Sequence, residues 1–410
     1  MPKPNIDFID RSISELSCPV CNCNKSKIFL EISDVPVFCN LLWRSQNEAQ
    51  NCQKGNIKLA FCTDCGHIFN VDFDPNLLDY TKSYENPLDF SPRFQAYSQS
   101  LANLLVERYK LYNKDIISIG CGNGLFLSRL CELGNNRGLG FDPALQERKE
   151  PLEISSNIKL IKDYYSDQYA NYPCDLIVCR HVLEHIYDPK NFLKMLRHAL
   201  DPFQNTVVFF EVPNALNIFK MLFIWDIIYE HYSYFTPTSL AHLFSLSQFN
   251  VTDIAEYFEG QFLGIHSTLS KKVVSNFFEQ RSQIDQIAMS ITKFAANYNK
   301  IVNKWKHKLE QKKDEGQRVV IWGTGSKGVT FLNTLKASHI EFAVDINPKK
   351  QGKYVAGTAQ RIVSPHFLRN YKPDVVIVMN PIYRQEIQKF LDNLGIPACI
   401  EIPLPSIKGS

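Results

Sequence analysis

Hydrophobic and polar positions divide the chain into stretches with different periods. Residues 76–270 alternate short apolar runs with amphipathic stretches, the pattern of a parallel α/β layer, and residues 316–410 resume it with the apolar run Val319–Trp322. Between them, residues 271–315 are charged and poor in glycine and proline, and their apolar positions recur at helical spacing. We therefore expect an α/β protein with two such domains joined by a helical linker.

The composition excludes several classes of protein. Of 410 residues, 45% are hydrophobic and 21% are charged, a balance that excludes a disordered chain. The net charge of +3 is too small for a nucleic-acid arm or a polybasic membrane patch. No apolar run approaches the roughly 20 residues of a membrane span, and no signal-peptide pattern opens the chain. We expect a cytoplasmic protein with no membrane or nucleic-acid partner, whose cysteines are mostly reduced.

Residues 1–75 contain two pairs of cysteines in CxxC hooks. Cys18-Pro-Val-Cys21 and Cys62-Thr-Asp-Cys65 each bring two sulfurs together, and two hooks complete a tetrahedral thiolate site for zinc. Four thiolates leave no open coordination position, so we expect the metal to organise a small N-terminal domain rather than to catalyse. The other cysteines of this stretch lack a hook partner and are expected to be bystanders: Cys23, Cys39 and Cys52.

A glycine-rich turn follows the apolar strand predicted at residues 115–119. Gly120, Gly122 and Gly124 allow the backbone to pass close to a ligand, and the helix after them offers its N-terminus to a carboxylate or phosphate. The next strand ends at Asp142-Pro143, about 20 residues on, where a carboxylate can accept from both ribose hydroxyls. Gly-x-Gly-x-Gly fits S-adenosylmethionine better than the dinucleotide pattern, so residues 76–270 are expected to form a class I, Rossmann-like methyltransferase domain.

Two further segments extend this predicted crevice. Asp163 is placed to meet the adenine amine, with a surface acid as the alternative. His181-Val-Leu-Glu184-His185 matches the inverted zinc-protease motif, but it follows a strand directly at the ligand-binding edge of the sheet, so we reject that interpretation. His181 is expected to face substrate and His185 to be structural. The residues expected to bind the cofactor are Gly120, Cys121, Gly122, Asn123, Gly124, Phe126, Asp142, Pro143, Asp163 and Arg180.

The aromatic segment Tyr229–Phe235 carries Glu230 beside His231. An acid and an imidazole in such a segment are costly to desolvate unless they are used. The alternative is a packed aromatic loop with a satisfied histidine, and the residues alone leave both interpretations open.

The order of these motifs resembles that of the sugar C-methyltransferases of deoxysugar biosynthesis, of the C-3 type, over nearly the full length. The CxxC hooks, the glycine turn, the H-x-x-E-H stretch and Tyr229-Glu230-His231-x-Ser-Tyr-Phe occur in the family's order. Gly260-Gln261, Lys327-Gly328 and Asp345-x-Asn347-Pro-Lys follow. The resemblance implies a structural zinc domain, a methyltransferase domain and a C-terminal Rossmann-like domain. It also implies methyl transfer to the carbon beside the ketone of a nucleotide-linked sugar.

The resemblance places catalytic residues at Tyr229, Glu230, His231 and His181, with Tyr84 as the best counterpart of a further family tyrosine. A C–H beside a ketone is a weak acid, so a base must remove the proton while a donor stabilises the enolate oxygen. We expect His231 to be the base, since imidazole accepts a proton near neutral pH. Glu230 would orient it or steady its charged form, and His181 or a tyrosine hydroxyl would donate to the oxyanion.

A second glycine turn, Gly323-Thr-Gly325-Ser-Lys327-Gly328, opens the C-terminal domain. It is a true Gly-x-Gly-x-x-Gly with Asp345 about 20 residues on, which by rule predicts a dinucleotide site. The resemblance implies instead that this domain holds the nucleotide end of the acceptor, without a redox cofactor. Lysines here could balance a diphosphate or form a solvated edge. The residues expected to bind substrate are Gly323, Gly325, Lys327, Asp345 and Lys353.

Three other functions stay open. O- or N-methylation of a sugar or small metabolite would need a base but no enolate stabilisation. A zinc-ribbon RNA methyltransferase is disfavoured by the near-neutral charge. A non-catalytic sugar-nucleotide binder is disfavoured by the intact glycine turn and by Asp142. We expect a monomer that closes on its own substrate.

Overall fold

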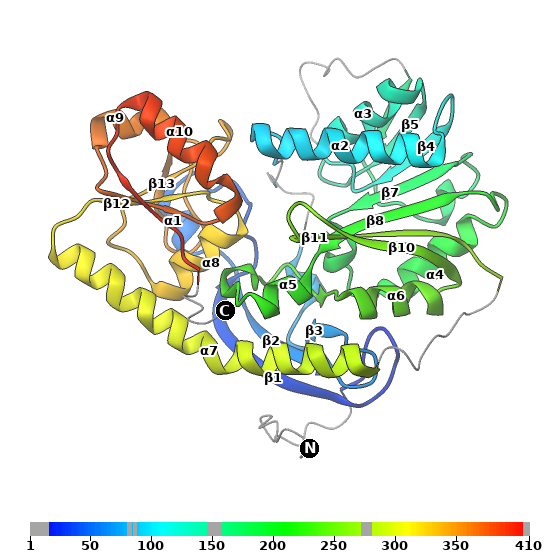
Figure 1. The fold of residues 1–410 in the computed structure, drawn as a ribbon, viewed down its shortest axis with the longest axis horizontal. Helices are drawn as coiled ribbons and strands as arrows, with labels where there is room; N and C mark the ends of the chain where they lie inside the picture. The colour runs from blue at the N-terminus through cyan, green and yellow to red at the C-terminus, as the bar shows by residue number, and fades with distance from the viewer. Residues whose placement is uncertain (1–15, 80–83, 85–87, 146–156, 272–280, 405–410) are drawn as a thin grey trace.

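The computed structural model describes residues 16–79, 84, 88–145, 157–271 and 281–404, and arranges them around three β-sheets (Figure 1). The first sheet is antiparallel and has the order β1-β2-β3-β9. Its last strand comes from the middle of the chain and begins two residues after His231, so it ties that segment to the N-terminal sheet. The elements of this part are β1 (Ser26–Pro36), α1 (Gln46–Gln50), β2 (Lys54–Cys62), β3 (Ile68–Asn70) and β9 (Ser233–Tyr234).

The central sheet has the order β10-β11-β8-β7-β4-β5-β6, with β11 antiparallel to both neighbours and the remaining pairs parallel. This is the class I methyltransferase fold that the sequence predicted. The chain order reverses between β4 and β7, and such switch points bind ligands at their carboxyl ends. The strands are β4 (Asp115–Ile119), β5 (Arg137–Phe141), β6 (Ile158–Ile161), β7 (Leu176–Arg180), β8 (Val207–Pro213), β10 (Phe249–Tyr257) and β11 (Phe262–Leu269).

Successive strand residues face opposite sides of this sheet, and helices cover both sides. Ile116 packs with α2 and α3, whereas Ile117 packs with α4 and α6. The two apolar faces explain why the central strands are apolar at nearly every position. The helices are α2 (Pro92–Tyr109), α3 (Leu125–Gly134), α4 (Pro189–Ala199), α5 (Ala215–Lys220) and α6 (Pro237–Leu246).

The third sheet is entirely parallel, in the order β14-β13-β12-β15-β16, and forms a Rossmann-like C-terminal domain. Its strands are β12 (Val319–Trp322), β13 (Phe342–Val344), β14 (Arg361–Val363), β15 (Val375–Val378) and β16 (Cys399–Glu401). Its helices are α8 (Ser326–Leu335), α9 (Leu368–Tyr371) and α10 (Arg384–Leu394). Short 3-10 turns lie at η1 (Pro75–Leu77), η2 (Asp167–Tyr169), η3 (Leu183–His185), η4 (Ile224–Asp226), η6 (Pro365–Phe367) and η7 (Pro381–Tyr383).

One long helix, α7 (Arg281–Asp314), runs along the three parts of the molecule (Figure 1). It packs against β1, α5 and α8, so a single apolar stripe contacts an element from each part. The predicted linker, residues 271–315, contains this helix, and its residues 272–280 lie outside the described part of the chain. The domain boundaries at residues 75, 270 and 315 stay predictions. Within the described ranges, no helix is both long enough and apolar enough to cross a bilayer.

Candidate active site

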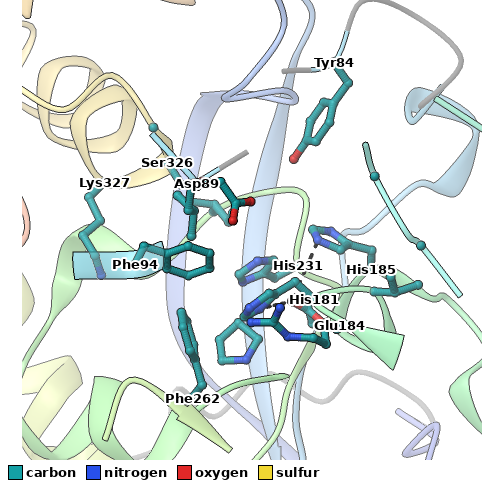
Figure 2. Close-up of a pocket in the computed structure, with 18 of the residues that line it drawn as sticks. Tyr84, Asp89, Phe94, His181, Glu184, His185, His231, Phe262, Ser326 and Lys327 are labelled. Carbon is teal, nitrogen blue, oxygen red and sulfur yellow. Dashed lines mark ion pairs between the residues drawn. The ribbon is translucent and has the colours of Figure 1, made fainter. Parts of the chain in front are cut away.

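A cavity of about 950 Å³ opens at the carboxyl ends of β4 and β7 and continues to the glycine turn of the C-terminal domain. Figure 2 shows His181, Glu184, His185 and His231 gathered in one part of it, with Lys327 on the other side of the view. Most of the predicted site residues line it: Tyr84, Gly120, Cys121, Gly122, Asn123, Phe126, Asp142, Pro143, Asp163, Arg180, His181, His231, Gly323, Gly325, Lys327 and Asp345. Four predicted residues do not: Gly124, Tyr229, Glu230 and Lys353.

The first glycine turn has the shape that a bound ligand requires. Gly120 and Gly122 have φ values of 66° and 56°, in the left-handed region that favours glycine. A Cβ on Gly122 would meet no heavy atom within 4 Å, so space for a ligand lies beside it. The Gly122 N–H and the Ala144 N–H each donate to the Asp142 carboxylate at 2.8 Å, fixing that side chain at the edge of the cavity. The residues of this turn therefore fit the S-adenosylmethionine that they were predicted to bind.

Arg180, expected to bind the cofactor, has its charge balanced inside the protein. Its Nη2 lies 2.9 Å from the fully buried Glu211, and its guanidinium lies 4.1 Å from the centre of the Phe126 ring. Burial alone would raise the pKa of Glu211, but Arg180 and His181 bring it down to about 2. Arg180 therefore lines the site as the partner of a buried carboxylate.

Glu211 is a functional residue that the sequence reasoning missed. The Tyr97 hydroxyl donates to its carboxylate, and its Oε1 lies 2.9 Å from His181 Nε2. The available signal was one acid inside the apolar run of residues 207–212, because a buried carboxylate needs partners. Glu211 thus holds Arg180, the last residue of β7, and His181, which follows it.

His181 reaches the cavity from a backbone conformation that is unusual for a side-chain-bearing residue. Its φ is 56°, which costs of order 1–3 kcal/mol outside glycine. Its N–H donates to the Glu211 carbonyl at 2.8 Å, and the ring lies edge-on to Phe262 at 4.5 Å. The surrounding contacts therefore maintain a strained turn that directs the imidazole into the cavity, as expected.

His231 lines the cavity beside a second histidine. The rings of His231 and His185 are 5.0 Å apart. Burial lowers the pKa of His231 well below its usual value, and His185, His181 and Lys327 lower it further. The imidazole is therefore neutral near pH 7 and can accept a proton.

His185, expected to be structural, also lines the cavity. Its Nδ1 donates to the Glu230 carbonyl at 2.8 Å, and burial lowers its pKa to about 4. Its Nε2 lies 4.0 Å from an oxygen of the buried Glu184, whose pKa burial raises to about 8. The H-x-x-E-H stretch thus supplies four cavity residues: His181, Val182, Glu184 and His185.

The Glu230 carboxylate does not face His231, contrary to expectation. It is fully buried, accepts from the Cys39 N–H at 2.9 Å, and is also hydrogen-bonded by Tyr84. Burial raises its pKa against these hydrogen bonds. Glu230 contacts His185 instead, through its backbone carbonyl.

Tyr229 packs between the N-terminal sheet and the site rather than lining the cavity. Its ring stacks on Phe73 at 5.6 Å, and its hydroxyl accepts from the Asp74 N–H at 2.8 Å. A Cβ on Gly55 would lie 2.4 Å from the ring, so Gly55 makes room for it. Tyr84, predicted as the counterpart of a further catalytic tyrosine, does line the cavity (Figure 2).

On the C-terminal side, the second glycine turn forms the cavity wall. A Cβ on Gly328 would lie 2.0 Å from the Gly323 carbonyl, so the third glycine is required by close helix packing. Lys327 pairs with Asp226 of η4, and Asp345 accepts from the Thr324 N–H at 3.0 Å. Lys353 lies away from the cavity, and two other lysines line it in its place: Lys349 and Lys350.

The four hook cysteines come together as expected. Their sulfurs lie within 4.8 Å of one another, with 3.6 Å between Cys18 and Cys65 and between Cys21 and Cys62. This set fits a tetrahedral thiolate site. Cys23, expected to be a bystander, lies 3.3 Å from the Cys62 sulfur and so belongs to the immediate surroundings of the cluster.

Known proteins match the chain in two parts. Residues 91–254 match the family model "Methyltransferase domain", and residues 267–395 match "C-methyltransferase C-terminal domain". The C-methyltransferase NovU of Streptomyces niveus is 24% identical over 330 residues, covering 75% of this chain and 77% of that protein. A ubiquinone biosynthesis O-methyltransferase of Pasteurella multocida is 24% identical over 221 residues, covering 48% of this chain and 90% of that protein.

Among solved structures, magnesium protoporphyrin IX methyltransferase of Synechocystis PCC 6803 is 15% identical with a TM-score of 0.35. The match covers 47% of this chain and 91% of that one. The two family matches, the relatives and the geometry of the first glycine turn agree: the chain is an S-adenosylmethionine-dependent methyltransferase.

Proposed function

We propose that the chain methylates the carbon beside the ketone of a nucleotide-linked ketosugar, with His231 as the base. The C-methyltransferase C-terminal match and the similarity to NovU across most of the chain support carbon as the acceptor atom. The observation that carries the proposal is a neutral imidazole, His231, in one cavity lined by both glycine turns. Such a cavity accommodates a methyl donor at one turn and a nucleotide-linked acceptor at the other.

S-adenosylmethionine, when bound, supplies an electrophilic methyl group on a sulfonium. Asp142 accepts from the ribose hydroxyls, and the N-terminus of α3 follows the glycine turn for the carboxylate end. Asp163 also lines this end, and Tyr169 holds its carboxylate through a hydrogen bond of 2.7 Å. Asp163 is proposed to accept from the adenine amine.

His231 takes the proton from the carbon beside the ketone. A hydroxyl from Tyr84 or an N–H from His181 donates to the enolate oxygen, which is the group whose charge grows in the transition state. We propose that the role expected for Glu230 falls to Glu184, an oxygen of which lies within 4.8 Å of a ring nitrogen of His231. Because burial raises the pKa of Glu184 to about 8, this side chain must ionise before it can stabilise the imidazolium. The aromatic wall, which includes Phe94 and Phe262, keeps water from the reacting carbon.

The nucleotide end of the acceptor is proposed to lie on the C-terminal domain. The glycine turn at Gly323 and Gly325 offers the start of α8 to a diphosphate, and Lys349 and Lys350 add positive charge. Lys327 forms an ion pair with Asp226, so a diphosphate would have to compete with that carboxylate for its charge. We propose no redox cofactor here, because the turn and its lysines suit a diphosphate that belongs to the substrate.

The four cysteines are proposed to hold a structural zinc ion. The ion would close the loop that precedes β1 onto the end of β2, and β3 of the same sheet carries β9. We also propose that the protein acts as a monomer that closes on its own substrate.

O-methylation is the second candidate, since the central domain also matches ubiquinone biosynthesis O-methyltransferases. The two are separated by incubating the full chain with S-adenosylmethionine and a panel of nucleotide-linked ketosugars and hydroxysugars. We expect one methyl added to a ketosugar, on carbon by NMR of the product. A methyl on oxygen, or turnover only with hydroxysugars, would contradict the proposal.

A further inference from the structure

A second group of metal-binding side chains lies in the cavity wall, separate from the cysteines. Glu184, His185 and His231 each offer one oxygen or nitrogen, and these atoms lie within 4.8 Å of one another. Figure 2 shows the three side chains in the same part of the pocket. Two imidazoles and a carboxylate form the usual ligand set of a divalent transition metal with open positions for a further ligand.

Glu184 is the observation that points to a cation. The residue is 2% exposed, and among the described residues its Oε2 has no hydrogen-bond partner. Its Oε1 lies 3.8 Å from His181 Nδ1 and 4.0 Å from His185 Nε2, both beyond hydrogen-bond distance. A buried carboxylate normally has a partner that compensates for lost water, and here a positive ion would supply it.

The ring of His185 is oriented by the kind of hydrogen bond that commonly orients metal-bound histidines. Its Nδ1 donates to the Glu230 carbonyl at 2.8 Å, which leaves the lone pair on Nε2, the atom nearer Glu184. A backbone carbonyl on the far nitrogen of a histidine is the common support for a metal ligand, because it fixes the tautomer and the ring orientation.

The H-x-x-E-H motif therefore contributes a different ligand set from that of the zinc proteases, where both motif histidines bind the metal. Here His181 Nε2 lies 2.9 Å from the Glu211 carboxylate and forms an ion pair with it when protonated. His231 arrives from a distant segment and takes its place beside Glu184 and His185. Metal–ligand distances of about 2.0–2.2 Å require the three groups to move slightly closer together.

We propose that Glu184, His185 and His231 bind a divalent transition-metal ion, and that this ion blocks methyl transfer. The ion takes the lone pair with which His231 accepts the proton, so metal and proton compete for one nitrogen. Binding of the ion is independent of the proposed function, whereas its inhibitory effect rests on it.

The test uses the full-length protein with zinc retained in the cysteines, dialysed briefly against a weak chelator and titrated with Co²⁺. We expect one additional Co²⁺ per chain, with visible d–d absorption and no sulfur-to-cobalt charge-transfer band. Glu184→Gln and His231→Gln should each weaken this binding at least tenfold. Glu132→Gln, an exposed position on α3, is the matched control and should bind as the wild type does. Circular dichroism and retained zinc confirm that each variant is folded.

Absence of the additional ion, or equal affinity in both variants and the wild type, would overturn the site. Deuterium exchange into the acceptor, measured with Co²⁺ bound, tests the second part and should fall in proportion to occupancy. Exchange that continues at full occupancy overturns the inhibition and also argues against His231 as the base. If the protein binds no additional Co²⁺ but its exchange still requires His231, the metal site alone is overturned and the proposed function stands.

Discussion

Glu211 illustrates how single buried residues organise this site. It is fully buried on β8, and it contacts Arg180, His181 and Tyr97. One carboxylate therefore neutralises a buried guanidinium and holds an imidazole that enters the cavity in a strained conformation.

Glu211→Gln should lower the free energy of unfolding by about 3–5 kcal/mol, because the buried Arg180 would lose its counter-charge. The measurement is urea denaturation followed by circular dichroism. Asp253→Asn is the control, since its ion pair with Arg108 is exposed and should change stability by at most about 1 kcal/mol. Equal, small effects of both substitutions would show that Glu211 is not needed to compensate Arg180.

Asp142 gives the second prediction at this scale. Asp142→Asn should weaken S-adenosylmethionine binding by about 10- to 100-fold, since each hydrogen bond to a charged group contributes roughly 1.5–3 kcal/mol. Titration calorimetry measures the dissociation constant, with the exposed Asp167→Asn as the control. An unchanged dissociation constant in Asp142→Asn would remove Asp142 from the cofactor site.

Residue types at the site were largely predictable, but side-chain directions were not. The spacing at 181–185 indicated chemistry at a strand end, yet the inward turn of His185 depends on η3 and on a hydrogen bond to Glu230. Glu230 and His231 are neighbours in sequence, and only the turn decides that the carboxylate points toward Cys39. Glu211 was missed because its partners come from two other elements.

At the scale of elements, α7 contacts all three parts of the chain. Its buried stripe packs on β1, α5 and α8. Phe294, fully buried in this stripe, lies edge-on to Phe219 of α5 at 4.9 Å. The helix therefore fixes the positions of the N-terminal sheet and the C-terminal domain relative to the site between them.

Phe294→Ala should lower the free energy of unfolding by about 3–5 kcal/mol, the usual result of removing a buried aromatic side chain. Met289→Ala on the same helix is 64% exposed and should have little effect. Thermal unfolding monitored by circular dichroism compares the two. Similar unfolding temperatures for both variants would contradict the structural role of α7.

The strand-turn-helix units and the long helix were predictable because their periods are local. The two-residue strand β9 was not, because its partner β3 lies far away in sequence and no local pattern marks the pairing. That pairing places the segment containing His231 against the N-terminal sheet. The position of His231, the proposed base, therefore depends on a long-range contact that no local sequence pattern predicts.

At the scale of the whole molecule, the cysteine cluster is connected to the active site. The hook at Cys62 and Cys65 begins at the last residue of β2 and leads into β3, and β3 pairs with β9, which begins two residues after His231. Losing the metal should therefore affect both the N-terminal sheet and the catalytic segment.

Cys62→Ser should abolish the bound zinc and lower the unfolding temperature, since structural zinc sites contribute directly to folding free energy. Atomic emission should give about one zinc per chain in the wild type and in the exposed control Cys399→Ser. A full zinc content in Cys62→Ser would refute the four-thiolate assignment.

The central claim is that His231 removes a proton from the carbon that receives the methyl group. In deuterium oxide without S-adenosylmethionine, the wild-type protein should exchange that proton of its ketosugar acceptor, as measured by NMR or mass spectrometry. His231→Asn should lose the exchange and keep its affinity for S-adenosylmethionine, while His198→Asn, an exposed histidine on α4, should behave as the wild type does. Undiminished exchange in His231→Asn would contradict the account.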